Sequence, residues 1–335
     1  FIIYFRFRKS DVGTEMYWSG LYDADNRENR RVKEAKRTIE DMKKINAVAG
    51  KHCICKVGIL YKYDVSWDSE NDIYLKPLEE ISNNAWFLTL QKNHIPFDFI
   101  DFREDIKMEE LQNYELIIAP HITMISEVQS EVLKAYTKIG GTLILGARSG
   151  YKNVHGHVIR KPIPGIVSDL IGGNVDEYTV LGPAEVGNEK IVWKDDGQKT
   201  VGLHMHEILN VDTAEVIAEY EMNYYKGSPA LIKNTYEDGC VYYFGAAFSE
   251  DTANKLLDII GLNQLFEKWI DLPWEAELCI RGDENYQYYF VLNYKPYVIE
   301  VHLKEKAYEL IQQDEVCDTI AIEPYGVRVF KRTTI

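Results

Sequence analysis

The first fifty residues contain two different patterns of hydrophobic and polar positions. Residues 1–8 are mostly bulky and apolar and alternate with charges in their second half, which predicts a β-strand with one buried face. A polar loop follows. Residues 29–46 then place apolar side chains three and four apart, on one face of a helix. These are Val32, Ala35, Ile39, Met42 and Ile45.

One strand and one helix cannot cover their own apolar faces. We therefore expect residues 1–50 to be the last βα unit of a larger parallel structure. The chain opens on a strand pattern at Phe1 and lacks an initiating Met, so we also expect more of the protein to precede it.

Short apolar runs alternate with helical patterns after Gly50. The predicted strands are 57–61, 97–100, 116–119 and 142–145, and the predicted helices between them are 73–93, 107–112 and 126–139. This alternation is typical of a parallel sheet covered by helices on both faces. We expect an α/β fold over residues 51–270, doubly wound and flavodoxin-like or class I amidotransferase-like.

The later chain is richer in strand patterns. Residues 166–225 contain short extended pieces, 230–235 and 240–245 predict a hairpin, and 249–269 predict a helix. Residues 271–335 form a separate segment with short strands and polar turns, which predicts a small antiparallel β domain of sandwich or barrel type. Its predicted strands are 277–281, 286–293, 297–303, 307–311, 319–322 and 326–331.

The composition of the chain disfavours some classes of binding partner. The 335 residues include 38 Lys or Arg and 53 Asp or Glu, a formal charge of −15, which disfavours nucleic acid and anionic membrane surfaces. No apolar run approaches the ~18–20 residues of a membrane-spanning helix, and no secretory signal pattern opens the chain. Five cysteines, an odd number in a long chain, favour a reduced, cytoplasmic setting.

One turn could carry nucleophilic chemistry. Gly146-Ala-Arg148-Ser-Gly150 follows a predicted parallel strand, where class I amidotransferases carry Gly-x-Cys-x-Gly. Arg148 occupies the Cys position and cannot form a thioester. Ser149 comes one place too late for a Gly-x-Ser-x-Gly elbow. We expect this turn to keep the fold without the chemistry.

Metal and nucleotide signals are weak. Two His-x-His pairs have a spacing that can bind zinc, although ordinary surface or hydrogen-bonded imidazoles are the interpretation we favour. A Cys-x-Cys pair has no second pair at matching spacing, and no glycine-rich phosphate motif is present. We expect no metal and no cofactor. The residues concerned are His155, His157, His204, His206 with Glu207 beside it, Cys53 and Cys55.

Aromatic residues are abundant and gather around the first βα loop. The chain has 23 Tyr, 12 Phe and 6 Trp, which suits protein interfaces and also sugar rings. Loops at the carboxyl ends of parallel barrel strands are where such folds place active sites. A sugar site and a packed interface both remain open on these residues. The cluster comprises Tyr4, Phe5, Phe7, Tyr17 and Trp18, with Arg8 and Glu15 among them.

A series of short motifs runs in order along nearly the whole chain. They are Tyr4-Phe-Arg-Phe-Arg-Lys-Ser10, Gly13-Thr-Glu-Met-Tyr-Trp-Ser-Gly-Leu21, Val57-Gly-Ile-Leu-Tyr-Lys-Tyr-Asp64 with Trp67, Gly227-Ser-Pro-Ala-Leu231, Gly239-Cys-Val-Tyr-Tyr-Phe-Gly245, Leu272-Pro273, Arg281-Gly282, Tyr289-Phe-Val-Leu-Asn293 and Pro324-Tyr-Gly-Val327. In this order the chain resembles the C-terminal portion of glycoside hydrolase family 42 β-galactosidases. The resemblance implies the end of a catalytic TIM barrel at 1–50, an amidotransferase-like trimerisation domain at 51–270 and a C-terminal β domain at 271–335.

The resemblance also implies a retaining mechanism with two Glu carboxyls about 5–5.5 Å apart. Both lie on earlier barrel strands in the family, so we expect no catalytic residue in this chain and no activity from it alone. Glu15 matches an acidic residue that hydrogen-bonds galactose hydroxyls, and Phe7 matches a Trp that lines the sugar site. Trp18 stands where the family usually has a substrate-contacting His, and Arg8 matches an Arg that holds barrel structure.

The implied partners are a galactoside and two further copies of the chain, in a homotrimer formed through the middle domain. An alternative hypothesis is a non-catalytic oligomerisation or sugar-binding module with an amidotransferase-like fold, which Trp18 keeps open. A third is an amidotransferase-like enzyme with a different nucleophile. An upstream reading frame with two Glu at barrel-strand ends would favour the first.

Overall fold

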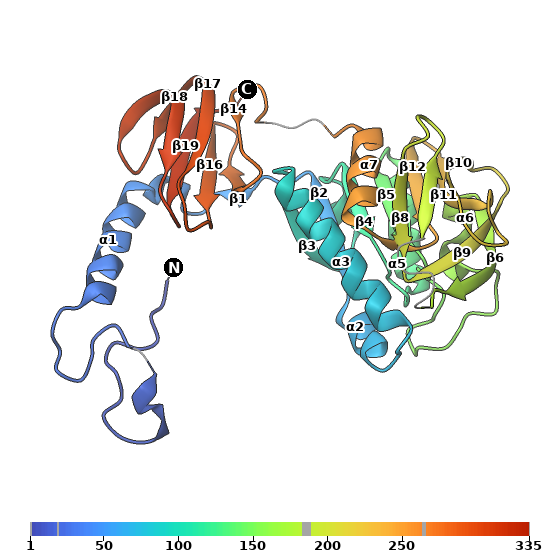
Figure 1. The fold of residues 1–335 in the computed structure, drawn as a ribbon, viewed down its shortest axis with the longest axis horizontal. Coiled ribbons are helices and arrows are strands. Elements are labelled where there is room, and N and C mark those ends of the chain that lie inside the picture. The colour runs from blue at the N-terminus through green and yellow to red at the C-terminus, as the bar shows by residue number, and fades with distance from the viewer. Residues whose placement is uncertain (1, 19, 183–188, 263–265, 335) are drawn as a thin grey trace. The chain divides into compact units, whose positions relative to one another are not determined.

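The computed structural model describes residues 2–18, 20–182, 189–262 and 266–334. The chain divides into two compact units, and each is described by itself (Figure 1). The middle unit spans residues 54–267. The other unit combines residues 1–53 with residues 268–335 and is called the terminal unit below.

Five parallel strands form the centre of the middle unit. They lie in the order β12-β5-β4-β2-β3. Their bounds are β2 (Val57–Tyr61), β3 (Phe97–Asp101), β4 (Leu116–Ala119), β5 (Thr142–Gly146) and β12 (Gly239–Phe244). The strands predicted at 57–61, 97–100, 116–119 and 142–145 are thus confirmed within a residue.

Both faces of these strands are covered by helices, which is why the strands are apolar without alternation. Ile59 faces one core with residues of α3 (Leu75–Lys92) and α7 (Glu250–Ile260). The next residue, Leu60, faces a second core with Val65, from the short helix that follows β2, and with residues of three further helices. These are α4 (Met108–Leu111), α5 (Glu127–Lys138) and α6 (Ser168–Ile171). A short helix that the sequence did not predict, α2 (Tyr63–Glu70), follows β2.

Antiparallel strands extend this sheet to ten. The hairpin predicted after residue 230 is confirmed, because β11 pairs with β12 around Glu237 at φ 53°. A second pair of strands, β6 and β9, forms its own small sheet. Bounds are β6 (Gly173–Val180), β7 (Lys190–Trp193), β8 (Lys199–Leu203), β9 (Met205–Val211), β10 (Glu215–Tyr220), β11 (Pro229–Tyr236) and β13 (Ala247–Phe248).

The helix predicted over residues 249–269 is shorter than expected. Helix α7 ends at Ile260, and Gly261 follows at φ 70° with its N–H bonded to the Leu257 carbonyl. Glycine adopts this left-handed conformation without steric cost, so it terminates the helix. Residues 263–265 lie outside the described residues, and Ile270–Asp271 is strand β14.

An antiparallel sheet of seven strands lies at the centre of the terminal unit. Its strands are β1 (His52–Cys53), β14, β15 (Ala276–Gly282), β16 (Tyr286–Asn293), β17 (Ile299–Glu309), β18 (Asp314–Ile322) and β19 (Val327–Thr333). Two strands predicted at 297–303 and 307–311 are one strand, β17, with an irregular register between Leu303 and Ala307. Val48, from the short helix η2 (Asn46–Val48), packs against Tyr288 and Val329.

The strand predicted at the start of the chain is wrong. Among residues 2–8 only Arg8 forms a bridge, to Tyr22, and no ladder follows. A β-strand needs a neighbouring strand whose backbone N–H and C=O groups form hydrogen bonds with it along its length. Here the neighbour is the short stretch that contains Tyr22, which bonds to the backbone of Phe7 and Lys9.

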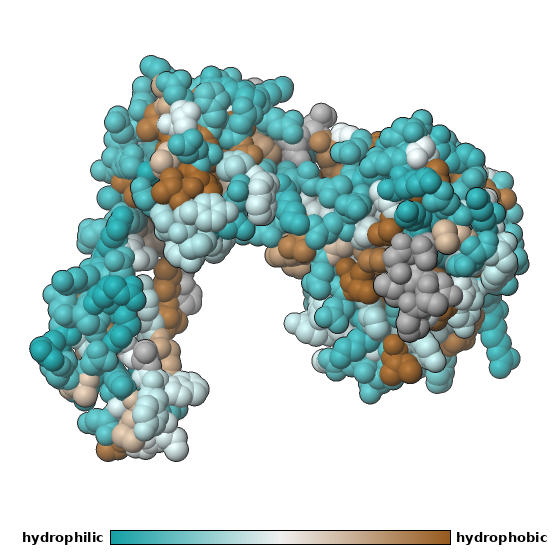
Figure 2. All heavy atoms as spheres, viewed as in Figure 1, coloured by the Kyte–Doolittle hydropathy of each residue, from teal (hydrophilic) through white to brown (hydrophobic). Residues whose placement is uncertain are grey.

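The helix predicted at 29–46 is confirmed as α1 (Arg30–Lys44). Asn29 caps it, since its side-chain oxygen accepts the Val32 N–H at 3.2 Å. Figure 2 shows that the visible surface is mainly hydrophilic, with hydrophobic residues in small patches. This agrees with the acidic, charge-rich composition.

Candidate functional site

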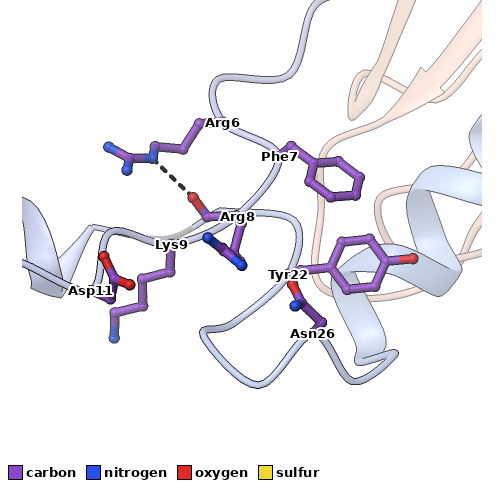
Figure 3. Close-up of a pocket in the computed structure, with 7 residues that line it drawn as sticks. All are labelled: Arg6, Phe7, Arg8, Lys9, Asp11, Tyr22 and Asn26. Carbon is purple, nitrogen blue, oxygen red and sulfur yellow. Dashed lines mark hydrogen bonds between the residues drawn. The ribbon is translucent and has the colours of Figure 1, made fainter.

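A hollow of about 810 Å³ lies in the loops before α1 (Figure 3). Phe7 and Tyr22 form an aromatic wall, with ring centroids 4.9 Å apart and planes tilted by 42°. The remaining lining is polar and mostly cationic, and it comprises Arg6, Arg8, Lys9, Asp11 and Asn26. Exposed ring faces beside hydrogen-bond donors suit a ligand with both an apolar face and hydroxyl groups.

Local backbone contacts position this wall. The N–H of Tyr22 donates to the Phe7 carbonyl at 2.8 Å, and the Lys9 N–H donates to the Tyr22 carbonyl at 2.9 Å. Arg6 Nε donates to the Arg8 carbonyl at 2.9 Å. These bonds hold the two aromatic residues on adjacent pieces of chain.

The three predicted substrate-binding residues are placed differently. Phe7 lines the hollow and is 67% exposed. Glu15 lies on η1 (Thr14–Tyr17) and accepts a hydrogen bond from Arg6 Nη1 at 3.0 Å, so it connects to the hollow through Arg6. Trp18 follows η1, is 66% exposed and is not among the lining residues.

The sequence did not single out Tyr22 or Asn26. A signal for Tyr22 was available, because it is an aromatic residue just past the cluster around the same loop. Its pairing with Phe7 depends on how the loop closes, which no local pattern specifies.

The turn after β5 in the middle unit holds Arg148 in a left-handed conformation, φ 66°, with its side chain buried. Its Nε lies 3.1 Å from Glu207 Oε1, and its guanidinium lies 3.7 Å from the centre of the Tyr178 ring. Ser149 Oγ donates to the Gly146 carbonyl at 2.7 Å and is also buried. A buried ion pair therefore occupies the turn after β5, and the Ser149 hydroxyl is engaged by the backbone.

Glu207 is fully buried at this turn. Burial raises the pKa of its carboxyl, while the Arg148 charge and a 2.6 Å hydrogen bond from the Tyr243 hydroxyl oppose that rise. The carboxylate thus depends on Arg148 and Tyr243 for its charge. Glu207 therefore pairs with Arg148. The sequence placed Glu207 only beside a His-x-His motif and did not predict this ion pair.

His121 links three segments near the same turn. Its Nδ1 lies 2.8 Å from the Ala147 carbonyl and its Nε2 lies 2.6 Å from Ser82 Oγ. Ser82 Oγ in turn accepts the Phe248 N–H at 2.8 Å. This pattern fits a neutral imidazole that donates from Nδ1, and burial lowers the pKa of His121 to about 3.

His155 and His157 are exposed, with ring centroids 6.4 Å apart. The second His-x-His pair is hydrogen-bonded within the fold. His206 is buried between the Tyr225 hydroxyl and the Gly202 carbonyl, each 2.8 Å away. His204 lies 2.6 Å from the Tyr74 carbonyl. Among the described residues, no group of three or more His, Cys, Asp or Glu has an arrangement that could hold a metal ion. The five cysteines are free thiols.

In the part of the chain that the structure describes, no helix combines the length and hydropathy needed to cross a bilayer. The fold and the sites together define a mixed α/β, sheet-rich protein with an aromatic and cationic hollow near its first residues.

Comparisons with known protein families identify the family to which this α/β protein belongs. Residues 55–264 match the family described as β-galactosidase trimerisation domain, and residues 276–332 match β-galactosidase C-terminal domain. The chain belongs to the glycoside hydrolase family 42 β-galactosidases, which confirms the resemblance in its motifs.

Relatives match over almost all of this chain. β-Galactosidase BgaA of Clostridium cellulovorans is 28% identical over 98% of the chain and 49% of its own length. β-Galactosidase GanA of Bacillus subtilis is 25% identical over 99% of the chain and 49% of its length. The chain therefore spans about half the length of the curated relatives it matches.

A solved structure supports the fold. The β-galactosidase from Bacillus circulans sp. alkalophilus matches with a TM-score of 0.86 and 22% identity, covering 98% of this chain and 49% of its own.

Proposed function

We propose that this chain is the C-terminal part of a retaining β-galactosidase that hydrolyses terminal β-D-galactosides, with the catalytic Glu pair upstream. One observation carries the proposal: two β-galactosidase family matches follow each other in order along residues 55–332. Relatives named as β-galactosidases also align over nearly the whole chain and half of their own length. The two carboxyls would lie about 5–5.5 Å apart in a retaining site.

In this proposal the chain has three parts: the end of a TIM barrel at 1–50, a doubly wound, amidotransferase-like domain at 51–270 and a β domain at 271–335. The strand order β3-β2-β4-β5-β12 supports the second part, because it corresponds to the flavodoxin-like order 2-1-3-4-5. The buried Arg148–Glu207 pair supports the absence of amide chemistry at the turn after β5. The middle domain would form the contacts of a homotrimer, as the description of its family indicates.

Phe7, Glu15 and Trp18 would contact the galactoside beside the upstream carboxyls. Phe7 would stack on the apolar face of the sugar, and Glu15 would accept bonds from its hydroxyls. The two exposed rings and an exposed carboxylate on neighbouring loops support this assignment. The free thiols favour a reducing, cytoplasmic location.

Hydrolysis of nitrophenyl β-galactoside tests the proposal, with other nitrophenyl sugars as a panel. The 335-residue chain alone should show no turnover. The intact reading frame that encodes it should hydrolyse the galactoside, and Glu15→Gln in that protein should raise KM more than it lowers kcat.

Two outcomes would overturn the proposal. One is turnover by the 335-residue chain that survives Glu15→Gln, which would place the carboxyls within these residues. The other is an intact protein that binds galactosides without cleaving them, which would favour the non-catalytic module. Light scattering of the intact protein tests the trimer separately.

A further inference from the structure

Four exposed aromatic side chains surround one end of the antiparallel sheet in the terminal unit. Trp274 precedes β15, Tyr294 and Tyr297 lie between β16 and β17, and Tyr325 precedes β19. Each is between 49% and 71% exposed. We call these four residues the aromatic rim.

Register places the pieces of the rim at the same end of the sheet. Ala276 pairs with Asn293 where β15 begins and β16 ends. Lys295 Nζ lies 4.7 Å from the centre of the Trp274 ring, and the Tyr325 N–H donates to the Lys295 carbonyl at 3.3 Å. Trp274, Lys295 and Tyr325 are therefore contiguous, although they come from three separate loops.

A buried side chain fixes these loops to one another. Asn293 is 1% exposed, and its amide nitrogen donates to the carbonyls of Tyr297, Ile322 and Glu323 at 2.8, 3.1 and 3.0 Å. Its Oδ1 accepts the Lys295 N–H at 2.8 Å. The loops that carry the rings are thus held in place before any ligand arrives, which lowers the entropic cost of binding.

Tyr325 supplies an independent observation. Its backbone has φ 55°, a left-handed conformation that is uncommon for bulky residues, while its ring is 71% exposed. Backbone held in this conformation is often found at ligand clamps. A glycine at this position would relieve the backbone strain. The Tyr325 ring does little to offset that strain, because it is exposed and buries little apolar surface.

The surroundings of the rim favour a neutral, hydroxyl-rich ligand. Lys295 provides a donor beside the Trp274 ring, and Glu277 provides an acceptor close enough to Tyr294 to raise its pKa. Charged groups among the rings argue against a protein partner, since stable interfaces need about 800 Å² per partner with a largely uncharged core. The net charge of −15 argues against nucleic acid.

We propose that the aromatic rim is a carbohydrate-binding site that stacks Trp274 and Tyr325 on the apolar faces of a galactose-containing polysaccharide. The inference rests on the proposed function for the identity of the sugar. The rim would hold a polymer on the protein through residues that take no part in hydrolysis.

Calorimetric titration of the 335-residue chain with a soluble β-1,4-galactan tests the rim, with dextran as the comparison polymer. We expect galactan to bind, and Trp274→Ala and Tyr325→Gly each to weaken binding at least fivefold. Tyr325→Gly removes the ring at a position where glycine relieves strain, so its effect cannot be attributed to misfolding. The matched control is Trp67→Ala, since Trp67 is 60% exposed in the middle unit; it should change galactan affinity less than twofold.

Four results would overturn the inference. The first three are no galactan binding by the unaltered chain, equal weakening by Trp67→Ala, and binding by the chain that is absent from the intact protein. A change in molar mass of Trp274→Ala, with galactan binding retained, would make the rim a protein interface and would also overturn it. A different measurement tests the proposed function. If that function fails, the intact protein does not hydrolyse nitrophenyl galactoside, while galactan still binds the rim.

Discussion

Two Arg–Glu ion pairs of nearly equal length occur in very different surroundings. Arg148 and Glu207 in the middle unit are 3.1 Å apart, with side chains 5% and 0% exposed. Arg6 and Glu15 in the terminal unit are 3.0 Å apart, with side chains 34% and 52% exposed. The chemical groups are the same, so any difference in their contribution comes from what surrounds them.

The surroundings decide what happens when one partner is removed. Water replaces a lost partner at an exposed pair, so such pairs contribute about 0–1 kcal/mol. A buried pair leaves an uncompensated charge when it is broken, which costs about 3–5 kcal/mol. The buried pair is therefore part of the fold, whereas the exposed pair leaves Glu15 available to a ligand.

Replacing Arg148 should give the largest effect. Arg148→Met should destabilise the middle unit by about 4 kcal/mol, because Glu207 is left buried without its counter-ion. Urea unfolding followed by tryptophan fluorescence measures this loss. The pKa of Glu207, already raised by burial, should rise further. A raised carboxyl pKa means that the folded state holds its proton longer, so the penalty should be small below about pH 4.5 and should grow as pH rises.

The matched control is the double variant Arg148→Met, Glu207→Gln. Because the double variant has no buried charge without a counter-ion, its free energy of unfolding should recover more than half of the loss caused by Arg148→Met. If the single and double variants were equally unstable at pH 8, packing around Tyr178 rather than charge would explain the loss, and the comparison of the two pairs would fail.

His121 should give a smaller effect that depends on pH. Its folded pKa of about 3 lies below its ordinary value of 6.5, so the unfolded chain takes up a proton first as pH falls. The middle unit should therefore lose about 2 kcal/mol of stability between pH 7 and pH 5 through this residue. His121→Asn should abolish that part of the pH slope, whatever its effect at pH 7. An unchanged slope in the variant would show that His121 is not the titrating group.

The sequence predicted the parallel strands β2 to β5 and helices α3 to α5 well because their signals are local. Strand β2 is an apolar run, and α5 begins at Ser126, whose side chain accepts the Gln129 N–H while Gln129 bonds back to Ser126. The pairing of Arg148 with Glu207 was not predictable, because it joins separate elements that meet only in the folded sheet.

Predictions in the terminal unit failed where a partner was required. Residues 1–8 have a strand pattern, but the short stretch at Tyr22 is their neighbour and no ladder forms. The sequence singled out Phe7 of the aromatic wall but not Tyr22, and it did not predict how the two rings are arranged. Phe7 pairs with Tyr22, and Glu15 pairs with Arg6, through loop geometry that has no periodicity to detect.

The cap of α1 should give an effect between those of the two ion pairs. Asn29→Ala removes the acceptor for the Val32 N–H and should cost about 1 kcal/mol in the terminal unit. Hydrogen exchange of the first-turn amides of α1 measures this loss locally. Asn29→Ser should retain most of the protection, because a serine hydroxyl also caps a helix N-terminus. It places no second carboxylate beside Asp23, whose Oδ2 lies 3.4 Å from Asn29 Nδ2. Equal exchange in Asn29→Ala and the unaltered chain would contradict the cap.

The exposed pair should give the smallest change in stability. Arg6→Ala should alter the unfolding free energy of the terminal unit by at most about 0.5 kcal/mol, since water solvates Glu15 in its place. Its consequence should instead be functional in the intact protein, because Arg6 lines the hollow and orients the Glu15 carboxylate. We expect KM for nitrophenyl β-galactoside to rise several-fold with a smaller change in kcat. Arg27→Ala, which removes a more exposed pair with Asp25 outside the lining of the hollow, is the control and should leave KM unchanged. A loss of stability as large as that of Arg148→Met would show that exposure does not separate the two pairs.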